Sequence, residues 1–188
     1  MTVPEAQPAR SDADLIEAWR RGEESAASEL VLRHTRPLAR FLAAAGAKED
    51  LDDLVQETFF RAFRKIGTFK GSASFRTWLL AIGSNALKDL RRKHRNRTVL
   101  SIEERELKDE SSDPHEQVVA RDALARLEEQ VAQLPPMQRN VFLMRAQQGA
   151  PYEEIAAALG TSEGAARVHY HQAVKRIRVA LEGGEEAR

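Results

Sequence analysis

Apolar residues recur every three or four positions along most of this chain, and that period is typical of amphipathic α-helices. In the N-terminal half it predicts a short helix after Ser11, a longer one ending at Gly46 and a third from Asp50 to Ile66. Ser11 with Asp14 three positions later resembles a capping box, and Asp50 is placed to cap the third helix. The pattern therefore predicts helices packed through one apolar face each.

A fourth helix is predicted from Phe75 to Arg97, after a turn-rich loop at 67–74. One arc of this helix is apolar: Leu79, Ile82, Gly83, Ala86, Leu87 and Leu90. The opposite arc is basic, with Asn85 and Trp78 at its border, and its cations follow the i, i+3, i+4, i+7 spacing: Lys88, Arg91, Arg92 and Arg95. Such a face can bind phosphates, a base edge and an unpaired base.

A solvated basic face is the simpler alternative for this helix. However, from Lys88 to Arg97 only Asp89 opposes the positive charge, and such clustering is costly unless a polyanion is near. The density of cations therefore favours a nucleic-acid contact.

The C-terminal part predicts four further helices, the first resuming near Glu116. The last two, Tyr152 to Leu159 and Ser162 to about Leu181, are joined by a tight turn at Gly160, which is the pattern of a helix-turn-helix. Six residues of the last helix face outward, where a recognition helix meets the major groove: Arg167, Val168, His171, Gln172, Lys175 and Arg178.

Composition bounds the function classes. The hydrophobic fraction of 42% supports folded cores, whereas 29 basic and 29 acidic residues give no net attraction to nucleic acid. The chain has no cysteine, and no metal-ligand set, phosphate loop or positioned nucleophile is found, so we expect no metal, no cofactor and no enzyme activity. Without a signal peptide or a long apolar run, we expect a soluble, cytoplasmic protein.

These features predict an all-α fold of two small helical domains joined by a flexible linker, the C-terminal one a helix-turn-helix domain. Eight acidic against three basic residues between Glu103 and Asp122 mark the linker, and Glu103 to Asp113 is placed to screen the basic helix in the free protein. The expected division is a tail, a first domain, an acidic linker, a second domain and a second tail: 1–10, 11–97, 98–117, 118–182 and 183–188.

Three blocks of this sequence resemble the extracytoplasmic-function sigma factors of bacterial RNA polymerase. They are DLVQETFFRAFRKIGTF, FRTWLLAIGSNALKDLRR and LPPMQRNVFLMRAQQGAPYEEIAAALGTSEGAARVHYHQAVKRIR, and the likeness extends from about Asp14 to Leu181. The resemblance implies a transcription initiation factor that binds core RNA polymerase, recognises two promoter elements and helps to open the DNA. It also implies regulation by an anti-sigma factor.

The resemblance assigns roles to residues at matching positions. A surface that grips the clamp helices of the largest polymerase subunit is implied at Asp53, Leu54, Gln56, Glu57 and Arg61. The resemblance also implies a set of residues that bind the minus-ten element, on the loop that receives a flipped base and on the helix that holds the strand. They are Lys65, Phe69, Lys70, Ser74, Trp78, Asn85, Lys88, Arg91, Arg92 and Arg95. The resemblance also implies that the outward face of the last helix reads the minus-thirty-five element. Trp78 fits a core position as well as the minus-ten set.

Two alternatives stay open at this point. An operator-binding regulator would use the helix-turn-helix on duplex DNA without polymerase, and a helical adaptor would bind a protein and no DNA.

The recognition helix opens with Ala165 and Ala166 where the family often has a Thr-Val-Lys-Ser-Arg-type run, so the preferred promoter sequence cannot be transferred.

Overall fold

The structure is a computed structural model that describes residues 10–47, 50–98 and 115–183. Its elements are α1 (Asp12–Arg20), α2 (Glu24–Ala44), α3 (Leu51–Lys65), the 3-10 turn η1 (Ile66–Thr68), α4 (Phe75–Thr98), α5 (His115–Gln133), α6 (Pro136–Ala146), α7 (Tyr152–Leu159) and α8 (Glu163–Gly183). The described part of the chain is thus helical throughout, with turns between the helices, which confirms the predicted fold class.

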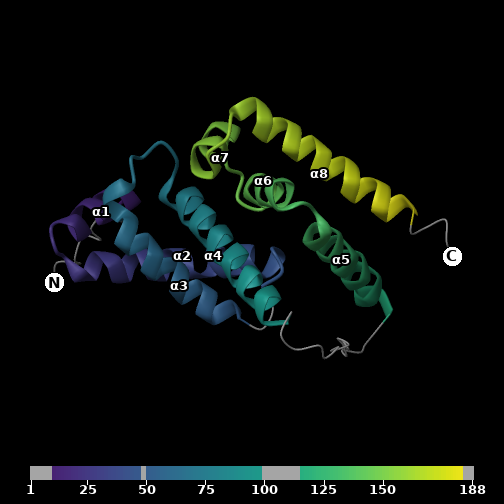
Figure 1. Cartoon of the computed structure of the whole chain (residues 1–188), viewed down its shortest axis with the longest axis horizontal. Helices are drawn as coiled ribbons and strands as arrows, with labels where there is room; N and C mark the ends of the chain where they lie inside the picture. The colour runs from purple at the N-terminus through teal and green to yellow at the C-terminus, as the bar shows by residue number, and fades with distance from the viewer. Residues whose placement is uncertain (1–9, 48–49, 99–114, 184–188) are drawn as a thin grey trace, which may run out of the picture.

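Helices α1 to α4 form the N-terminal unit, in which α4 packs against both α2 and α3 (Figure 1). The predicted apolar arc of α4 is the buried one, with Leu79 only 1% exposed. Gly83 lies where α4 crosses the neighbouring helices, because a Cβ atom there would come within 3.0 Å of Leu38 Cδ1 and 3.4 Å of Thr58 Cγ2. The absence of a side chain therefore allows this close crossing.

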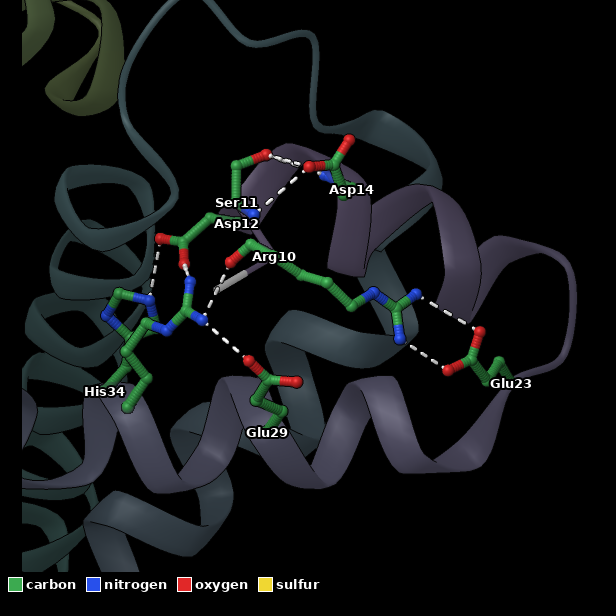
Figure 2. A network of polar contacts seen from close by, with 8 residues as sticks. Arg10, Ser11, Asp12, Asp14, Glu23, Glu29 and His34 are labelled. Carbon is green, nitrogen blue, oxygen red and sulfur yellow. Dashed lines mark hydrogen bonds and ion pairs between the residues drawn. The ribbon is translucent and has the colours of Figure 1, made fainter. Parts of the chain in front are cut away.

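A polar network fixes α1 on α2 (Figure 2). The capping box of Ser11 and Asp14 is present, as predicted. At the start of α1, Asp12 accepts a hydrogen bond from Arg33 at 2.6 Å and lies 2.8 Å from Nε2 of the buried His34. Because these contacts join side chains from two helices, they set the position of α1 beyond what apolar packing alone would fix.

Helices α5 to α8 form the C-terminal unit, in which α6 and α7 pack against α8. Gly160 ends α7 in the left-handed conformation, with φ 66°. Ser162 then caps α8, since its Oγ accepts from the amide of Ala165 at 3.1 Å. Both features confirm the predicted turn of the helix-turn-helix.

Two details differ from the sequence-based expectation. Asp50 occupies the N-cap position of α3, but its side chain makes no capping hydrogen bond. Helix α4 continues to Thr98, and α5 already begins at His115, so both ends of the expected linker 98–117 are helical. Residues 99–114, including the acidic stretch expected to screen α4, lie outside the described residues.

The two units pack on each other, and their buried apolar residues form one cluster. Helix α4 contacts α6 and α7, and the end of α2 contacts α5 and α6. Figure 1 shows α4 as the N-terminal helix nearest to the C-terminal unit, with α7 beside its N-terminal end. This packing decides which functional faces are open.

Candidate nucleic-acid interface

The basic face of α4 lines a cavity between the two units. Asn85, Lys88, Arg91 and Arg95 are all exposed, and they border a space of about 690 Å³. Its other wall belongs to the C-terminal unit and includes Pro135, Pro136, Met137, Asn140 and Leu159. Solvent therefore reaches these side chains, but a strand running along α4 would have to pass between α4 and α6.

Arg92 is separated from this group. Its guanidinium lies 3.8 Å from Asp89, and Asp89 also accepts a hydrogen bond from Arg61 of α3 at 2.8 Å. The hydrogen bond from Arg61 lowers the pKa of the Asp89 carboxyl despite partial burial. Asp89 thus partly offsets the positive charge of the basic face on the side nearest α3.

Arg91 is engaged with the C-terminal end of α2. Its Nη2 donates to the carbonyl of Ala45 at 2.6 Å and to that of Gly46 at 3.3 Å. Burial of the guanidinium lowers the pKa of Arg91. A cation at a helix C-terminus satisfies orphan carbonyls and interacts favourably with the helix dipole. In this arrangement Arg91 therefore stabilises α2, a role that spacing alone did not predict.

The loop before α4 carries an aromatic cluster beside a small cavity. Phe69 lies 5.2 Å from Trp78 between ring centroids, and Phe75 packs against both rings. Phe69, Lys70 and Trp78 line a cavity of about 140 Å³ that Ala157 and Ala158 of α7 help to close. Trp78 is half-buried and so belongs to the core and to this cavity at once. Lys65, Lys70 and Ser74 are exposed.

Glu154 of α7, which the sequence did not single out, contacts the start of α4. Its Oε2 accepts a hydrogen bond from the amide of Ser74 at 2.8 Å and one from Thr77 Oγ1 at 3.1 Å. Burial raises the pKa of the Glu154 carboxyl, but the hydrogen bonds from Ser74 and Thr77 outweigh it and lower the pKa overall. The ionised carboxylate is thus the form that this contact favours.

The outward face of α8 is exposed, as is the basic face of α4, but the α4 residues also border the cavity between the units. Its six predicted residues are all exposed, and Val168 is 52% exposed. Arg167 pairs with Glu163 and lies 4.8 Å from the centroid of the Tyr152 ring. Gln172 accepts a hydrogen bond from Gln138 of α6 at 2.9 Å. These contacts hold the start of the recognition face in a defined position.

On α3, four of the five residues in the predicted polymerase-binding set lie at the surface. Asp53, Gln56 and Glu57 are exposed, and Arg61 bridges Glu57 at 2.6 Å and Asp89. Leu54 is only 4% exposed and forms part of the floor of a cavity of about 250 Å³ between α3 and α4. Leu54 therefore shapes this surface from below, whereas the polar side chains form it.

Arg139 of α6 is a second contact that sequence reasoning missed. It is 7% exposed, and it donates to the carbonyls of Val131, Ala132 and Leu134 at the end of α5 and to that of Ala45 at 3.1 Å. Burial lowers the pKa of Arg139, and the nearby Arg91 lowers it further. Nothing in its spacing distinguishes this arginine from an exposed one.

Two family models match the chain. Residues 30–97 match sigma-70 region 2, and residues 124–177 match sigma-70 region 4. No helix within the described ranges has both the length and the apolarity needed to span a bilayer.

Relatives of the same kind match over nearly the whole length. The chain is 32% identical over 179 residues to the RNA polymerase sigma factor NccH of Alcaligenes xylosoxydans xylosoxydans, covering 93% of this chain and 96% of the relative. It is 27% identical to the ECF RNA polymerase sigma-E factor of Escherichia coli K12, covering 89% and 92% of the two chains. The solved structure of CnrH in complex with the cytosolic domain of CnrY is similar, with a TM-score of 0.69, 29% identity and coverage of 92% and 97%.

Proposed function

This chain belongs to the extracytoplasmic-function sigma factors of bacterial RNA polymerase, and we propose that residues 11–97 bind core polymerase and the minus-ten element while residues 118–182 read the minus-thirty-five element. As a sigma factor it directs the polymerase to promoters and assists the start of transcription. The family assignment favours this function over the operator-binding regulator and over the adaptor.

The observation that carries the residue assignment is the pair of basic helical faces on separate units. Asn85, Lys88 and Arg95 share one face of α4, and Lys175 and Arg178 share the outer face of α8. Cations on the first face suit the phosphates of a separated strand, whereas the second has the geometry of a helix that enters the major groove. In the proposed complex Arg91 and Arg92 join the first face.

The cavity beside Phe69 and Trp78 is the proposed site for a flipped base of the minus-ten element. Aromatic rings offer stacking to an unpaired base, and Lys70 lines the same cavity. Ser74 is exposed on the same loop and is proposed to add a polar contact. Since Ala157 and Ala158 of the C-terminal unit close part of this cavity, the base enters only after the units separate. Lys65, the last residue of α3, precedes the loop that carries Phe69 and is proposed to contact the DNA backbone.

Asp53, Gln56, Glu57 and Arg61 are proposed to bind the clamp helices of the polymerase, with Leu54 supporting them. A protein partner that covers these faces, an anti-sigma factor, is also proposed, and CnrH is known in complex with the cytosolic domain of CnrY. We place this activity in the cytoplasm and assign no catalytic step to the chain, because a sigma factor acts by binding.

Transcription from a promoter library with core polymerase tests this function. The double variant Lys88→Ala/Arg92→Ala leaves the contact of Arg91 with α2 in place. Arg36→Ala/Arg40→Ala is the matched control, because it removes two exposed arginines from α2 at the same i, i+4 spacing.

The α4 variant is expected to lose promoter opening, and the slope of its log affinity for single-stranded minus-ten DNA against log salt should fall by roughly 1.4, the value for two lost phosphate contacts. The control is expected to keep both properties. Equal losses in the two double variants would contradict the assignment of α4. Specific duplex binding without affinity for polymerase would contradict the proposed function.

A further inference from the structure

Two charged side chains of the C-terminal unit contact helix ends of the N-terminal unit. Glu154 contacts the start of α4, and Arg139 contacts the end of α2. At one end, the carboxylate of Glu154 accepts from Ser74 and Thr77 at the first turn of α4, where amides lack helical partners and the helix dipole is positive. At this end an anion is the favoured side chain. Glu154 is therefore matched to the site that it occupies.

At the other contact the charge is reversed. Arg139 donates to the carbonyl of Ala45, the C-cap residue directly after α2, where the helix dipole is negative. The same carbonyl accepts from Arg91 of α4 at 2.6 Å. Gly46 follows with φ 90°, and a Cβ atom there would lie 2.7 Å from Nη2 of Arg91 and 4.0 Å from Cβ of Ala132 in α5. Residues from four helices, α2, α4, α5 and α6, thus meet closely at this point.

The proposed minus-ten surface lies between these two contacts. Lys88, Arg91 and Arg95 face the C-terminal unit across the cavity of about 690 Å³. The smaller cavity beside Phe69 and Trp78 is closed in part by Ala157 and Ala158, which follow Glu154 on α7. The arrangement that Glu154 holds is therefore the one in which the strand and base sites are both obstructed.

We propose that Glu154 is an autoinhibitory latch, whose hydrogen bonds to Ser74 and Thr77 hold the free protein closed over its minus-ten surface. The functional part of this inference rests on the proposed function, whereas the latch itself does not. Promoter engagement then requires that these hydrogen bonds break and that α7 leave the start of α4. Ser74, itself in the proposed minus-ten set, becomes available when Glu154 withdraws.

Glu154 is distinguished from Arg139 by where its partners lie. Both hydrogen bonds described for Glu154 cross between the units, whereas Arg139 donates to three carbonyls of its own unit and one of the other. Removing Arg139 would also damage the end of α5. Glu154 can therefore be changed to test the latch with little direct effect on the fold of either unit.

The distance between the units in the free full-length protein tests the latch. Because the chain has no cysteine, spin labels at Ala13→Cys on α1 and Ala180→Cys on α8 attach only at those exposed positions. Pulsed electron spin resonance then gives the distance distribution between the labels. The distribution is measured in the labelled chain without further changes and in the labelled chain with Glu154→Gln or Glu154→Lys. Glu153→Gln is the matched control, because Glu153 is the exposed neighbour of Glu154.

The unchanged chain and the Glu153→Gln control are expected to give one narrow distribution at the closed distance. Glu154→Gln should raise the ratio of open to closed molecules about threefold to tenfold, a range expected for losing a partly exposed charged hydrogen bond. Glu154→Lys should raise it further, because it places a cation at the positive end of α4.

A broad or open distribution in the unchanged chain would overturn the proposal, as would closed distributions in both Glu154 variants. Opening that is equal in the Glu153 control would also overturn it. These outcomes do not depend on polymerase. If the Glu154 variants open but the protein fails to direct transcription, the latch stands and the proposed function fails.

Discussion

The two helices with basic faces, α4 and α8, carry similar chemistry in different surroundings. On α8 the predicted recognition residues point away from the rest of the protein, and Val168 is 52% exposed. On α4 the basic side chains face Met137 and Leu159 of the other unit across a cavity. The charge pattern of a helix therefore indicates a candidate binding face, whereas the packing between the units determines what lies opposite that face.

The supports of the two helices also differ. Helix α4 crosses α2 and α3 at close range through Gly83, and a polar network locks α1 onto the same bundle. Helix α8 packs along α6 and α7, and the buried guanidinium of Arg139 ties α6 to the end of α5. We expect the N-terminal unit to depend on apolar packing and the C-terminal unit to depend strongly on that arginine.

The largest effect is therefore expected from Arg139→Leu. This change removes the four hydrogen bonds that Arg139 donates to carbonyls at the ends of α5 and α2, although Arg91 still donates to Ala45. We expect the free energy of unfolding to fall by about 3 kcal/mol. Urea unfolding followed by circular dichroism measures the loss. Arg176→Leu, at an exposed position of α8, is the control and should change stability by less than about 0.5 kcal/mol. Similar values for both would show that Arg139 does not support this unit.

A smaller loss is expected from Gly83→Val on α4. The added side chain must displace Leu38, Leu42 and Thr58, which already lie 3.0 to 3.4 Å from the position of a Cβ atom. Overpacking of this kind costs about 1–3 kcal/mol. The same unfolding measurement tests it, and unchanged stability would contradict the close crossing of α4 with α2 and α3.

Acidification should weaken the N-terminal unit through His34. Burial lowers the pKa of His34 below its ordinary value of 6.5 and outweighs Asp12, which raises it. The neutral ring donates from Nε2 to Asp12, while its buried Nδ1 has no hydrogen-bond partner among the residues that the structure describes.

Above pH 6.5 both the folded and unfolded forms are neutral at this position, so the full stability is present there. As the pH falls below 6.5, the unfolded chain takes up a proton first and stability is lost, by up to about 1.4 kcal/mol per pH unit. The slope of the free energy of unfolding against pH, measured across this range, should be smaller in His34→Gln than in the unchanged protein. Identical slopes in the two proteins would contradict this assignment.

The smallest effect is expected from Gly164→Ala on α8, and its sign is reversed. A Cβ atom at Gly164 meets nothing within 4 Å, and the residue lies in a helix. Replacing glycine by alanine in a helix stabilises by at most about 1 kcal/mol. A rise in the melting temperature would confirm that the start of α8 is open, whereas a fall would indicate a contact there.

The local features of the fold could be predicted from sequence because each depends on neighbouring residues. Ser11 and Ser162 cap their helices as expected, and the apolar arc of α4 is buried. The sequence did not predict that Arg92 lies beside Asp89 and apart from the other cations of the basic face. This arrangement depends on Arg61 of another helix, which holds Asp89.

The contacts between the units could not be predicted. Glu154 and Ser74 are separated by 80 positions, and Arg139 and Ala45 by 94. Helical periodicity relates residues within a few turns only. Glu154 therefore had the same local pattern as the exposed Glu153 beside it, and only the packing of α7 against α4 distinguishes the two.

One measurement tests most directly the claim that packing controls the minus-ten surface but not the minus-thirty-five surface. The affinity of the free protein is measured for a single-stranded minus-ten oligonucleotide and for a minus-thirty-five duplex, both taken from the promoter selected in the library. The unchanged protein is compared with Glu154→Gln. We predict that Glu154→Gln strengthens binding of the single strand and leaves binding of the duplex unchanged. Equal changes for both DNAs, or no change for either, would contradict the account.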